Sequence, residues 1–369
     1  MVGIAKDSVV EIEAKELSVV LGGHKVLEIP LLRVNSHEVL IFVGPNGSGK
    51  TTLLLSLALL LKPAKGTIFY RGVSVLGANQ VLRQRRKIAV VFQEPLLLNS
   101  TVWNNVTLGL QLRGLRGDEV KKMGQKWLER FGITHLAKRQ ARTLSGGEAK
   151  RVSLARAFVL QPEVLFLDEP FNALDSPTRQ GLLEDFESVL IDTKVTTVMV
   201  THDRNEALAL ADRVAVLMAG SIKQVGVPEE VFGSPVDDEV AGFIEAGNIL
   251  HGVVGSQNNG LVSIQIGEQQ LHVVSNLSIG SQVTAYLHYE DVTISLPSAE
   301  EIRTSARNQM KGKIVKIFPL GSQLKVTLDC GFTLAAVITR RSWEDLGLEI
   351  GREIIASFKA SAVHLMPHR

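Results

Sequence analysis

The sequence predicts an α/β fold with a largely parallel sheet, followed by a smaller part built from short β-strands. Runs rich in β-branched and other apolar residues alternate with helical stretches from residue 39 to residue 218, which is typical of a parallel sheet buried on both faces. β-strand patterns are scarce between Pro95 and Gln161, which predicts a helical insertion there. After about Val240 the pattern changes to short strands with glycine turns.

The expected sheet is built from apolar runs with helices between them. An alternating stretch over residues 11–21, turned by Gly22 and Gly23, predicts an edge strand before them. The runs that predict buried strands cover residues 39–43, 88–92, 164–167, 196–200 and 214–218.

The change of pattern also sets the predicted domain boundaries. At 369 residues the chain is expected to form two or three domains. We expect a first domain over 1–239, with its helical part at about 96–162, and two β units over 240–302 and 303–369. The two β units are related by an internal repeat, in which residues 279–287 parallel residues 350–358. Because each unit is small for an independent core, we expect them to pack together or against a second chain.

Composition excludes several classes of protein. A hydrophobic fraction of 45% is typical of a packed globular protein and not of a disordered one. The single cysteine, Cys330, cannot form an intramolecular disulfide, which suits a reducing compartment. The longest apolar run, residues 53–61, is far shorter than the roughly 20 residues that cross a bilayer. If the protein serves a membrane, we expect it to do so from outside the bilayer.

A glycine-rich loop between an apolar strand and a leucine-rich helix predicts a triphosphate site. Its sequence, GPNGSGKTT, fits the phosphate-binding pattern G-x-x-x-x-G-K-[ST]. Backbone N–H groups of the loop and the start of the helix are expected to face the phosphates, with Lys50 on the β- and γ-phosphates and the Thr51 hydroxyl on Mg²⁺. The predicted ATP-binding residues are Gly44, Pro45, Asn46, Gly47, Ser48, Gly49, Lys50, Thr51 and Thr52.

Polar side chains follow three other predicted strands. Asp168 can hold Mg²⁺ at the tip of its strand, and Glu169 can take a proton from an attacking water. The Gln93 amide can face Mg²⁺ or water, and His202 can hydrogen-bond a γ-phosphate. Taken singly, each has an ordinary alternative, such as a solvated turn or a polar cap. Ligands bind at the carboxyl ends of strands in such sheets, so the four together favour a functional site.

Ser145 opens a further helix and is followed by Gly146 and Gly147. Serine is a favourable N-cap, and glycines allow an anion to approach bare N–H groups. An ordinary capped helix is the alternative.

With these motifs in this order, the chain to about residue 235 resembles the ATPase subunit of an ATP-binding-cassette (ABC) transporter. The resemblance implies a head-to-tail homodimer that holds ATP between Walker A of one subunit and Ser145 to Gly147 of the other, with Glu169 activating water. Two positions depart from the family: Glu148 is commonly Gln, and Val20 and Leu21 replace the aromatic residue that stacks on adenine. The matching segments are residues 44–52 for Walker A, Gln93 for the Q-loop, 144–148 for the signature, 168–169 for Walker B, 173–175 for the D-loop and 201–203 for the switch histidine.

The last unit resembles the small molybdate- or tungstate-binding β-barrel called the Mop or TOBE domain. A tetrahedral oxyanion is held by hydroxyl groups and cations. In the first unit the equivalent positions are Gly247, His288 and Glu290, so an anion site is expected in the second unit or at a dimer interface that it forms. Barrels that serve only in dimerisation are the alternative. The candidate oxyanion ligands are Ser305, Arg307, Lys359 and Ser361.

Together the two resemblances imply an ATP hydrolase that energises molybdate or tungstate import. Its expected place is the cytoplasmic face of the membrane, as a homodimer on two permease subunits fed by an extracytoplasmic solute-binding protein, with no nucleic acid among its partners. An importer of sugar, polyamine, sulfate or iron is an alternative. A soluble ABC protein of translation or repair usually has two cassettes or long coiled coils, and an oxyanion sensor would not need Glu169 and His202.

Overall fold

The computed structural model describes residues 9–244, 247–258, 260–297, 304–321 and 323–367. The chain divides into two compact units, Met1–Val231 and Phe232–Arg369. None of the helices within the described ranges is long and apolar enough to span a membrane.

The first unit is built on a six-stranded sheet with the order β10-β9-β3-β8-β7-β6. All neighbouring strands in it are parallel except β10, which pairs antiparallel with β9. Every residue of β3, β7 and β8 is buried, which explains their lack of polar alternation. The predicted α/β fold is therefore confirmed. The strands are β3 (Val39–Val43), β6 (Ile88–Val91), β7 (Val164–Asp168), β8 (Thr196–Val200), β9 (Arg213–Met218) and β10 (Ser221–Gly226).

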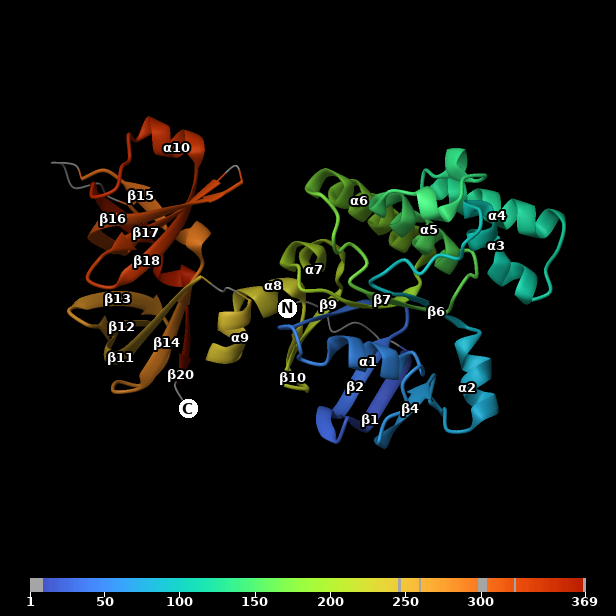
Figure 1. The fold of residues 1–369 in the computed structure, drawn as a ribbon. Helices are drawn as coiled ribbons and strands as arrows, with labels where there is room; N and C mark the ends of the chain where they lie inside the picture. Colours follow the sequence, from blue (N-terminus) through green and yellow to red (C-terminus); the bar gives the residue numbers. More distant parts are fainter. Residues whose placement is uncertain (1–8, 245–246, 259, 298–303, 322, 368–369) are drawn as a thin grey trace. The chain divides into compact units, whose positions relative to one another are not determined.

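A second, antiparallel sheet with the order β2-β1-β4-β5 covers one face of the parallel sheet together with α1 (Figure 1). The prediction of an edge strand at residues 11–21 was wrong, because β1 pairs with β2 on one side and β4 on the other. Alternation reports a half-buried strand but not its number of neighbours. The elements are β1 (Val10–Leu21), β2 (His24–Asn35), α1 (Lys50–Leu57), β4 (Lys65–Tyr70) and β5 (Val73–Ser74).

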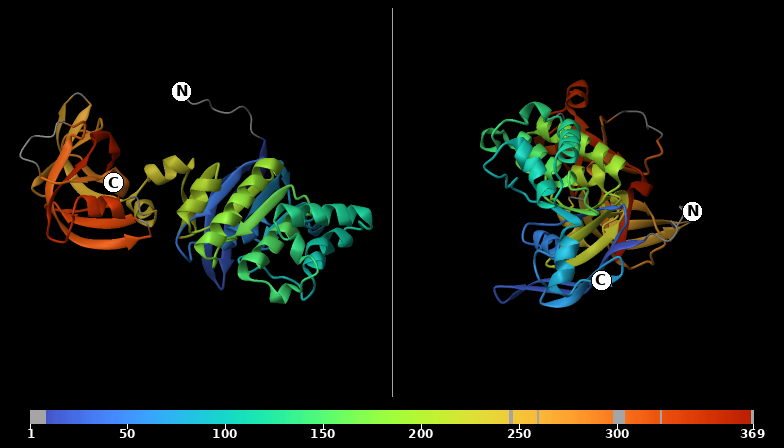
Figure 2. Two further views of the ribbon diagram at one scale, coloured as in Figure 1. Left: turned by 90° about the horizontal axis from the view of Figure 1, so that it is seen from above. Right: turned by 90° about the vertical axis from the view of Figure 1, so that its right-hand side faces the viewer.

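Helices cover the other face, and some form a separate group at one end of the unit (Figure 2). Trp127, Phe131 and Phe158 stack in the outlying group, and Phe186 joins them from α6. The helical insertion expected from the sequence is therefore present. The helices and turns are α2 (Ala78–Arg85), α3 (Val102–Leu112), α4 (Asp118–Arg130), η1 (Thr134–Leu136), η2 (Ala141–Thr143), α5 (Gly146–Phe158), α6 (Ser176–Thr193) and α7 (Arg204–Leu210).

The second unit holds two five-stranded sheets that exchange strands between the repeats. β20, the last strand of the chain, pairs with β14 of the first repeat, and β15 of the first repeat pairs with β19 of the second. One core of buried apolar side chains serves both sheets. The elements are α8 (Pro228–Gly233), α9 (Asp238–Phe243), β11 (Asn248–Asn258), β12 (Leu261–Ile266), β13 (Gln269–Val274), β14 (Gln282–Leu287), η3 (Tyr289–Asp291), β15 (Thr293–Ser295), β16 (Asn308–Leu320), β17 (Gln323–Asp329), β18 (Thr333–Thr339), α10 (Arg340–Asp345), β19 (Glu353–Phe358), η4 (Ala360–Ala362) and β20 (Val363–Pro367).

Two buried asparagines join the repeats in the same way. Asn308 Oδ1 accepts from the His272 N–H at 2.7 Å, and its Nδ2 donates to the His272 carbonyl at 2.8 Å. Asn248 forms the equivalent pair with the Ala335 backbone at 2.6 and 2.9 Å. Each asparagine therefore satisfies backbone groups of a strand in the other repeat, which fixes how the two sheets pack.

We predict that Asn308→Ala destabilises the second unit by about 1–3 kcal/mol, because the two hydrogen bonds from the buried Asn308 side chain to the His272 backbone are lost. Urea unfolding measures the effect. Asn258→Ala, at an exposed position in β11, is the control and should leave the unfolding midpoint unchanged. Equal stability of the two variants would contradict the role given to Asn308.

Candidate functional site

The glycine loop connects β3 to α1. Its backbone requires glycine for two reasons, positive φ angles and a lack of space for a side chain. Gly47 and Gly49 have φ angles of 81° and 99°, in the left-handed region. At Gly44, a Cβ atom would lie 2.0 Å from the carbonyl oxygen of Leu217. The loop is therefore held against β9 while its N–H groups lie at the start of α1.

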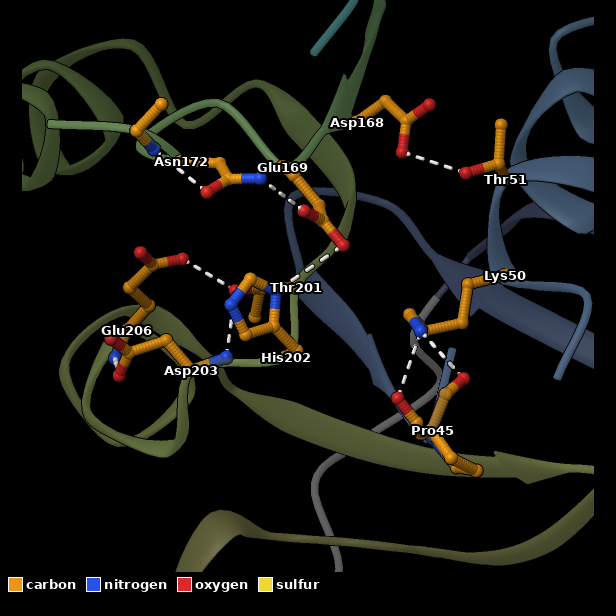
Figure 3. Close-up of polar contacts among 12 residues, drawn as sticks. Pro45, Lys50, Thr51, Asp168, Glu169, Asn172, Thr201, His202, Asp203 and Glu206 are labelled. Carbon is orange, nitrogen blue, oxygen red and sulfur yellow. Dashed lines mark hydrogen bonds and ion pairs between the residues drawn. The ribbon is translucent and has the colours of Figure 1, made fainter. Parts of the chain in front are cut away.

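Lys50 is the first residue of α1 and folds back over the loop. Its Nζ donates to the carbonyls of Gly44 at 2.8 Å and Pro45 at 3.0 Å (Figure 3). The residue is only 6% exposed, and this burial lowers the pKa of its ammonium, while the nearby charges of Glu169 and Asp168 oppose the shift. A buried cation beside a helix N-terminus is suited to binding an anion.

Asp168 ends β7 opposite the first turn of α1. The Thr51 hydroxyl donates to its Oδ1 at 3.0 Å (Figure 3). Burial raises the pKa of Asp168, and the bond from Thr51 opposes this shift. A hydroxyl and a carboxylate are hard oxygen ligands of the kind that Mg²⁺ prefers, so the two residues fit the predicted ion. Within the described ranges no cluster of three or more His, Cys, Asp or Glu residues forms a competing metal site.

Glu169 lies between Asn172 of its own loop and His202 of the loop after β8. Its Oε1 is 3.3 Å from His202 Nδ1, and its Oε2 accepts from Asn172 Nδ2 at 2.8 Å (Figure 3). The Glu169 backbone has a φ of 43°, a conformation that costs about 1 kcal/mol for a residue with a side chain. Asn172 lies between two of the matched segments, residues 168–169 and 173–175, but was not among the predicted site residues. The geometry holds the Glu169 carboxylate in one orientation.

One cavity of about 500 Å³ is lined by most of these residues, but the predicted residues Gly44, Pro45, Ser48 and Asp168 are not in its wall. Gln93, Glu169 and His202, which follow three different strands, are all in its wall. Neither Val20 nor Leu21 is in the wall, and the apolar residue from the early strands is Val26. The complete lining among the described residues is Val26, Asn46, Gly47, Gly49, Lys50, Thr51, Thr52, Gln93, Glu169, Asn172 and His202.

The predicted residues Ser145, Gly146 and Gly147 do not line this cavity. Ser145 caps α5: its Oγ accepts from the Glu148 N–H at 3.3 Å, and Glu148 Oε2 accepts from the Ser145 N–H at 2.7 Å. This capping box explains an acidic residue at position 148, and the bond from the Ser145 backbone lowers the pKa of Glu148. A Cβ placed on Gly146 would meet no other part of the described chain within 4 Å, whereas one on Gly147 would lie 2.6 Å from Thr178 Cγ2, so this end of the helix is open at Gly146.

The four candidate oxyanion ligands lie in the second unit. Asn308 and Phe358 are paired at the ends of β16 and β19, so the preceding Arg307 and the following Lys359 adjoin this pair. Ser305, Arg307, Lys359 and Ser361 are all exposed. Within the described part of the chain, no hydrogen bond or ion pair joins them to one another. Arg307 and Lys359 thus adjoin one end of the sheet, and the four residues do not form a closed anion site.

Comparison with known proteins adds two domain matches. Residues 28–172 match the ABC transporter family model, and residues 304–365 match the TOBE domain. The chain is 38% identical to a molybdate/tungstate import ATP-binding protein of Pyrococcus horikoshii over 90% of this chain and 94% of that protein.

The chain belongs to the ABC transporter ATP-binding family.

Members of this family bind ATP, and import ATP-binding subunits hydrolyse it to drive transport, so this chain is an ABC ATPase coupled to transport. It is also 33% identical to a sulfate/thiosulfate import ATP-binding protein of Synechococcus elongatus, over 95% of both chains. Among solved structures, one from Clostridium perfringens that is part of the cbiONQ ABC transporter complex matches with a TM-score of 0.58 and 29% identity, covering 65% of this chain and 95% of that one. A dimeric ATP-binding cassette bound to ADP and Pi matches with a TM-score of 0.54 and 28% identity, over 59% of this chain and 98% of that one.

A buried carboxyl group lies behind the switch histidine of this ABC ATPase. Glu206, in α7, is 4% exposed and accepts from the Thr201 hydroxyl at 2.6 Å. Asp203 pairs with Arg179 at 3.0 Å, and Arg179 also donates to the Leu174 carbonyl at 3.2 Å (Figure 3 shows Thr201, Asp203 and Glu206). Burial raises the pKa of Glu206 to about 7. This network joins two segments that are separate in the sequence, residues 174–179 and 201–206, so the sequence pattern did not predict it.

The raised pKa of Glu206 predicts that the first unit loses stability as the pH rises through this group's titration. The folded state keeps the proton up to about pH 7, whereas the ordinary value is 4.5, so the folded state binds more protons between these two values. The wild type should lose about 2 kcal/mol of unfolding free energy from this group between pH 5.5 and pH 8. Glu206→Gln, which does not titrate, should lack this component. Urea unfolding at both pH values tests it, with the exposed Glu187→Gln as control. The same pH dependence in wild type and Glu206→Gln would contradict it.

Proposed function

We propose that this chain is the ATP-hydrolysing subunit of an importer of molybdate or tungstate. The observation that carries the proposal is the similarity to the Pyrococcus protein along nearly the whole chain, which includes the TOBE match over residues 304–365. A second relative with the same printed function, from Thermococcus kodakarensis, is 34% identical over 76% of this chain.

In this proposal ATP lies in the cavity around the glycine loop. Lys50 exchanges the carbonyls of Gly44 and Pro45 for phosphate oxygens, since its ammonium already lies at the start of α1. Thr51, Asp168 and Gln93 hold Mg²⁺, which would supply positive charge to the phosphates. The residues proposed to contact ATP are Gly44, Pro45, Asn46, Gly47, Ser48, Gly49, Lys50, Thr51 and Thr52.

Glu169 is proposed as the base that takes a proton from the attacking water. It is fixed by Asn172 on one oxygen and lies beside His202 on the other, so its carboxylate is oriented before the reaction. His202 then holds the γ-phosphate, and Gln93 helps to position the water and the ion. Because Asn172 and His202 already hold the Glu169 carboxylate, this group needs little reorganisation when ATP binds.

Ser145, Gly146 and Gly147 are proposed to complete the site of a second copy of the chain. They do not line the cavity of their own chain, and the N-terminal end of α5 is open to an incoming phosphate. The family implies such a dimer and a membrane permease as partners. We place the homodimer on the cytoplasmic face of the membrane with two permease subunits, and an extracytoplasmic protein delivers the solute.

The second unit is proposed to bind the oxyanion through Ser305, Arg307, Lys359 and Ser361. Two cations and two hydroxyls from adjoining strand ends match the charge and hydrogen-bond demand of a tetrahedral dianion. We also propose that the chain forms domains over residues 1–239, 240–302 and 303–369. The first of these domains binds ATP and the last binds the anion. Sulfate is the second candidate for the cargo, since a sulfate/thiosulfate relative covers 95% of the chain.

We predict that Glu169→Gln reduces the ATPase rate by at least 100-fold and leaves the affinity for ATP within a few-fold of wild type, because only the proton acceptor is lost. Steady-state hydrolysis and equilibrium binding of a fluorescent ATP analogue measure the two quantities. Glu187→Gln, an exposed change of the same kind, should hydrolyse ATP normally. Substantial hydrolysis by Glu169→Gln would exclude Glu169 as the base.

We predict that Arg307→Ala and Lys359→Ala each weaken tungstate binding by about tenfold or more, because each removes a charge-assisted hydrogen bond. Calorimetric titration of the full-length protein with tungstate, molybdate and sulfate measures this effect and ranks the anions. The control is Arg340→Ala, which removes the same charge from an exposed position in α10. Unchanged affinity in both variants would remove the proposed site, and preference for sulfate would favour the second cargo.

A further inference from the structure

Lys150 is a buried lysine that the proposed mechanism does not use. It lies in α5, one turn after the signature glycines, and is 6% exposed. Its Nζ donates to the backbone carbonyl of Gln93. An ammonium has three N–H donors, and this carbonyl is its only hydrogen-bond acceptor in the part of the chain that the structure describes. Burying a charge is costly, so a buried ammonium that binds one backbone carbonyl indicates that this carbonyl must be held in place.

Two other side chains of the helical insertion hold the next residues of the loop. Arg156 donates to the carbonyl of Pro95 at 2.8 Å and to that of Leu96 at 2.9 Å. Asn105 of α3 exchanges hydrogen bonds with the backbone of Leu98, at 2.7 and 3.1 Å. The loop after β6 is therefore attached to the helical insertion along its length, and Lys150 makes the contact that lies at Gln93 itself.

Lys150 is also close to the acidic groups of the site. Burial lowers the pKa of its ammonium. The negative charges of Glu169 and Asp168 oppose this shift more than those of any other group. Lys150 therefore lies in the helix that begins at the signature, binds the Gln93 backbone and interacts electrostatically with the carboxylates at the end of β7.

We propose that Lys150 is a positioning residue that fixes Gln93 for ATP hydrolysis by holding its backbone carbonyl. This inference rests on the proposed role of Gln93 in the site. Removal of the Lys150 ammonium releases the peptide between Gln93 and Glu94, and the amide of Gln93 then no longer keeps one orientation toward the cavity. Lys150 acts through Gln93 and has no direct contact with the nucleotide.

A double-mutant cycle with Lys150→Met and Gln93→Ala tests this mechanism. Lys150→Met should lower kcat about tenfold and leave the affinity for ATP, measured with EDTA present, within twofold of wild type. The double variant should be no slower than Gln93→Ala alone, because both changes remove the same function. Lys150→Arg, which keeps the charge and the donors, should restore most of the rate. If Lys150→Met does not fold, Lys150→Gln enters the cycle with the same expectation.

Hydrogen exchange gives a readout that does not depend on activity. In Lys150→Met, the amides of residues 93–98 should exchange faster, while those of β7 and β8 stay as in wild type. Lys122→Met, which removes an exposed lysine of α4, is the control for charge and should change neither exchange nor rate.

The outcomes separate this inference from the proposed function. If wild type hydrolyses ATP and Glu169→Gln does not, the proposed function stands. The role of Lys150 is then overturned by a wild-type rate in Lys150→Met, by effects of Lys150→Met and Gln93→Ala that multiply, or by a normal rate in Gln93→Ala. A wild-type protein without ATPase activity would overturn the proposed function first, and the role of Lys150 with it.

Discussion

The proposed nucleotide site depends on one electrostatic arrangement. The Lys50 ammonium and bare backbone N–H groups lie together at the start of α1, at the carboxyl ends of the parallel strands. In the structure the carbonyls of Gly44 and Pro45 satisfy this ammonium. Carbonyl oxygens carry only partial negative charge, so a triphosphate is a stronger partner for the same cation. The tight turns at Gly47 and Gly49 and the close approach of Gly44 to β9 are what allow this geometry.

The parallel sheet gives this arrangement its chemistry. Side chains that lie far apart in the sequence meet because β6, β7 and β8 are neighbours and end at the same edge as β3. Asp168 thereby reaches Thr51, and Glu169 reaches His202. The helical insertion then attaches to this edge through the loop that carries Gln93. A movement of the insertion must displace that loop, which provides a physical link between a partner and the nucleotide.

Local patterns in the sequence predicted the fold class and several residues that share the cavity wall, among them Lys50, Glu169 and His202, because a glycine loop and buried strands need particular residues at fixed spacing. They did not predict which partners individual side chains contact. Asn172 on Glu169, Lys150 on Gln93 and the Thr201–Glu206 bond depend on the folded backbone. The strand exchange in the tail was also beyond the repeat pattern, since β15 and β20 are short and their pairing partners belong to the other repeat. The alternating pattern of β1 likewise does not show that this strand has a neighbour on each side.

The central claim is that one copy of the chain supplies Lys50 and Glu169 to an ATP molecule while another copy supplies Ser145 to Gly147. Sedimentation of the wild-type protein with ATP and EDTA, which allow binding and prevent Mg²⁺-dependent hydrolysis, tests this claim most directly. We expect ATP to double the molecular mass of the protein. Ser145→Arg, which blocks the open end of α5, should prevent this change without loss of ATP binding. A mass that does not respond to ATP at saturating nucleotide would contradict it.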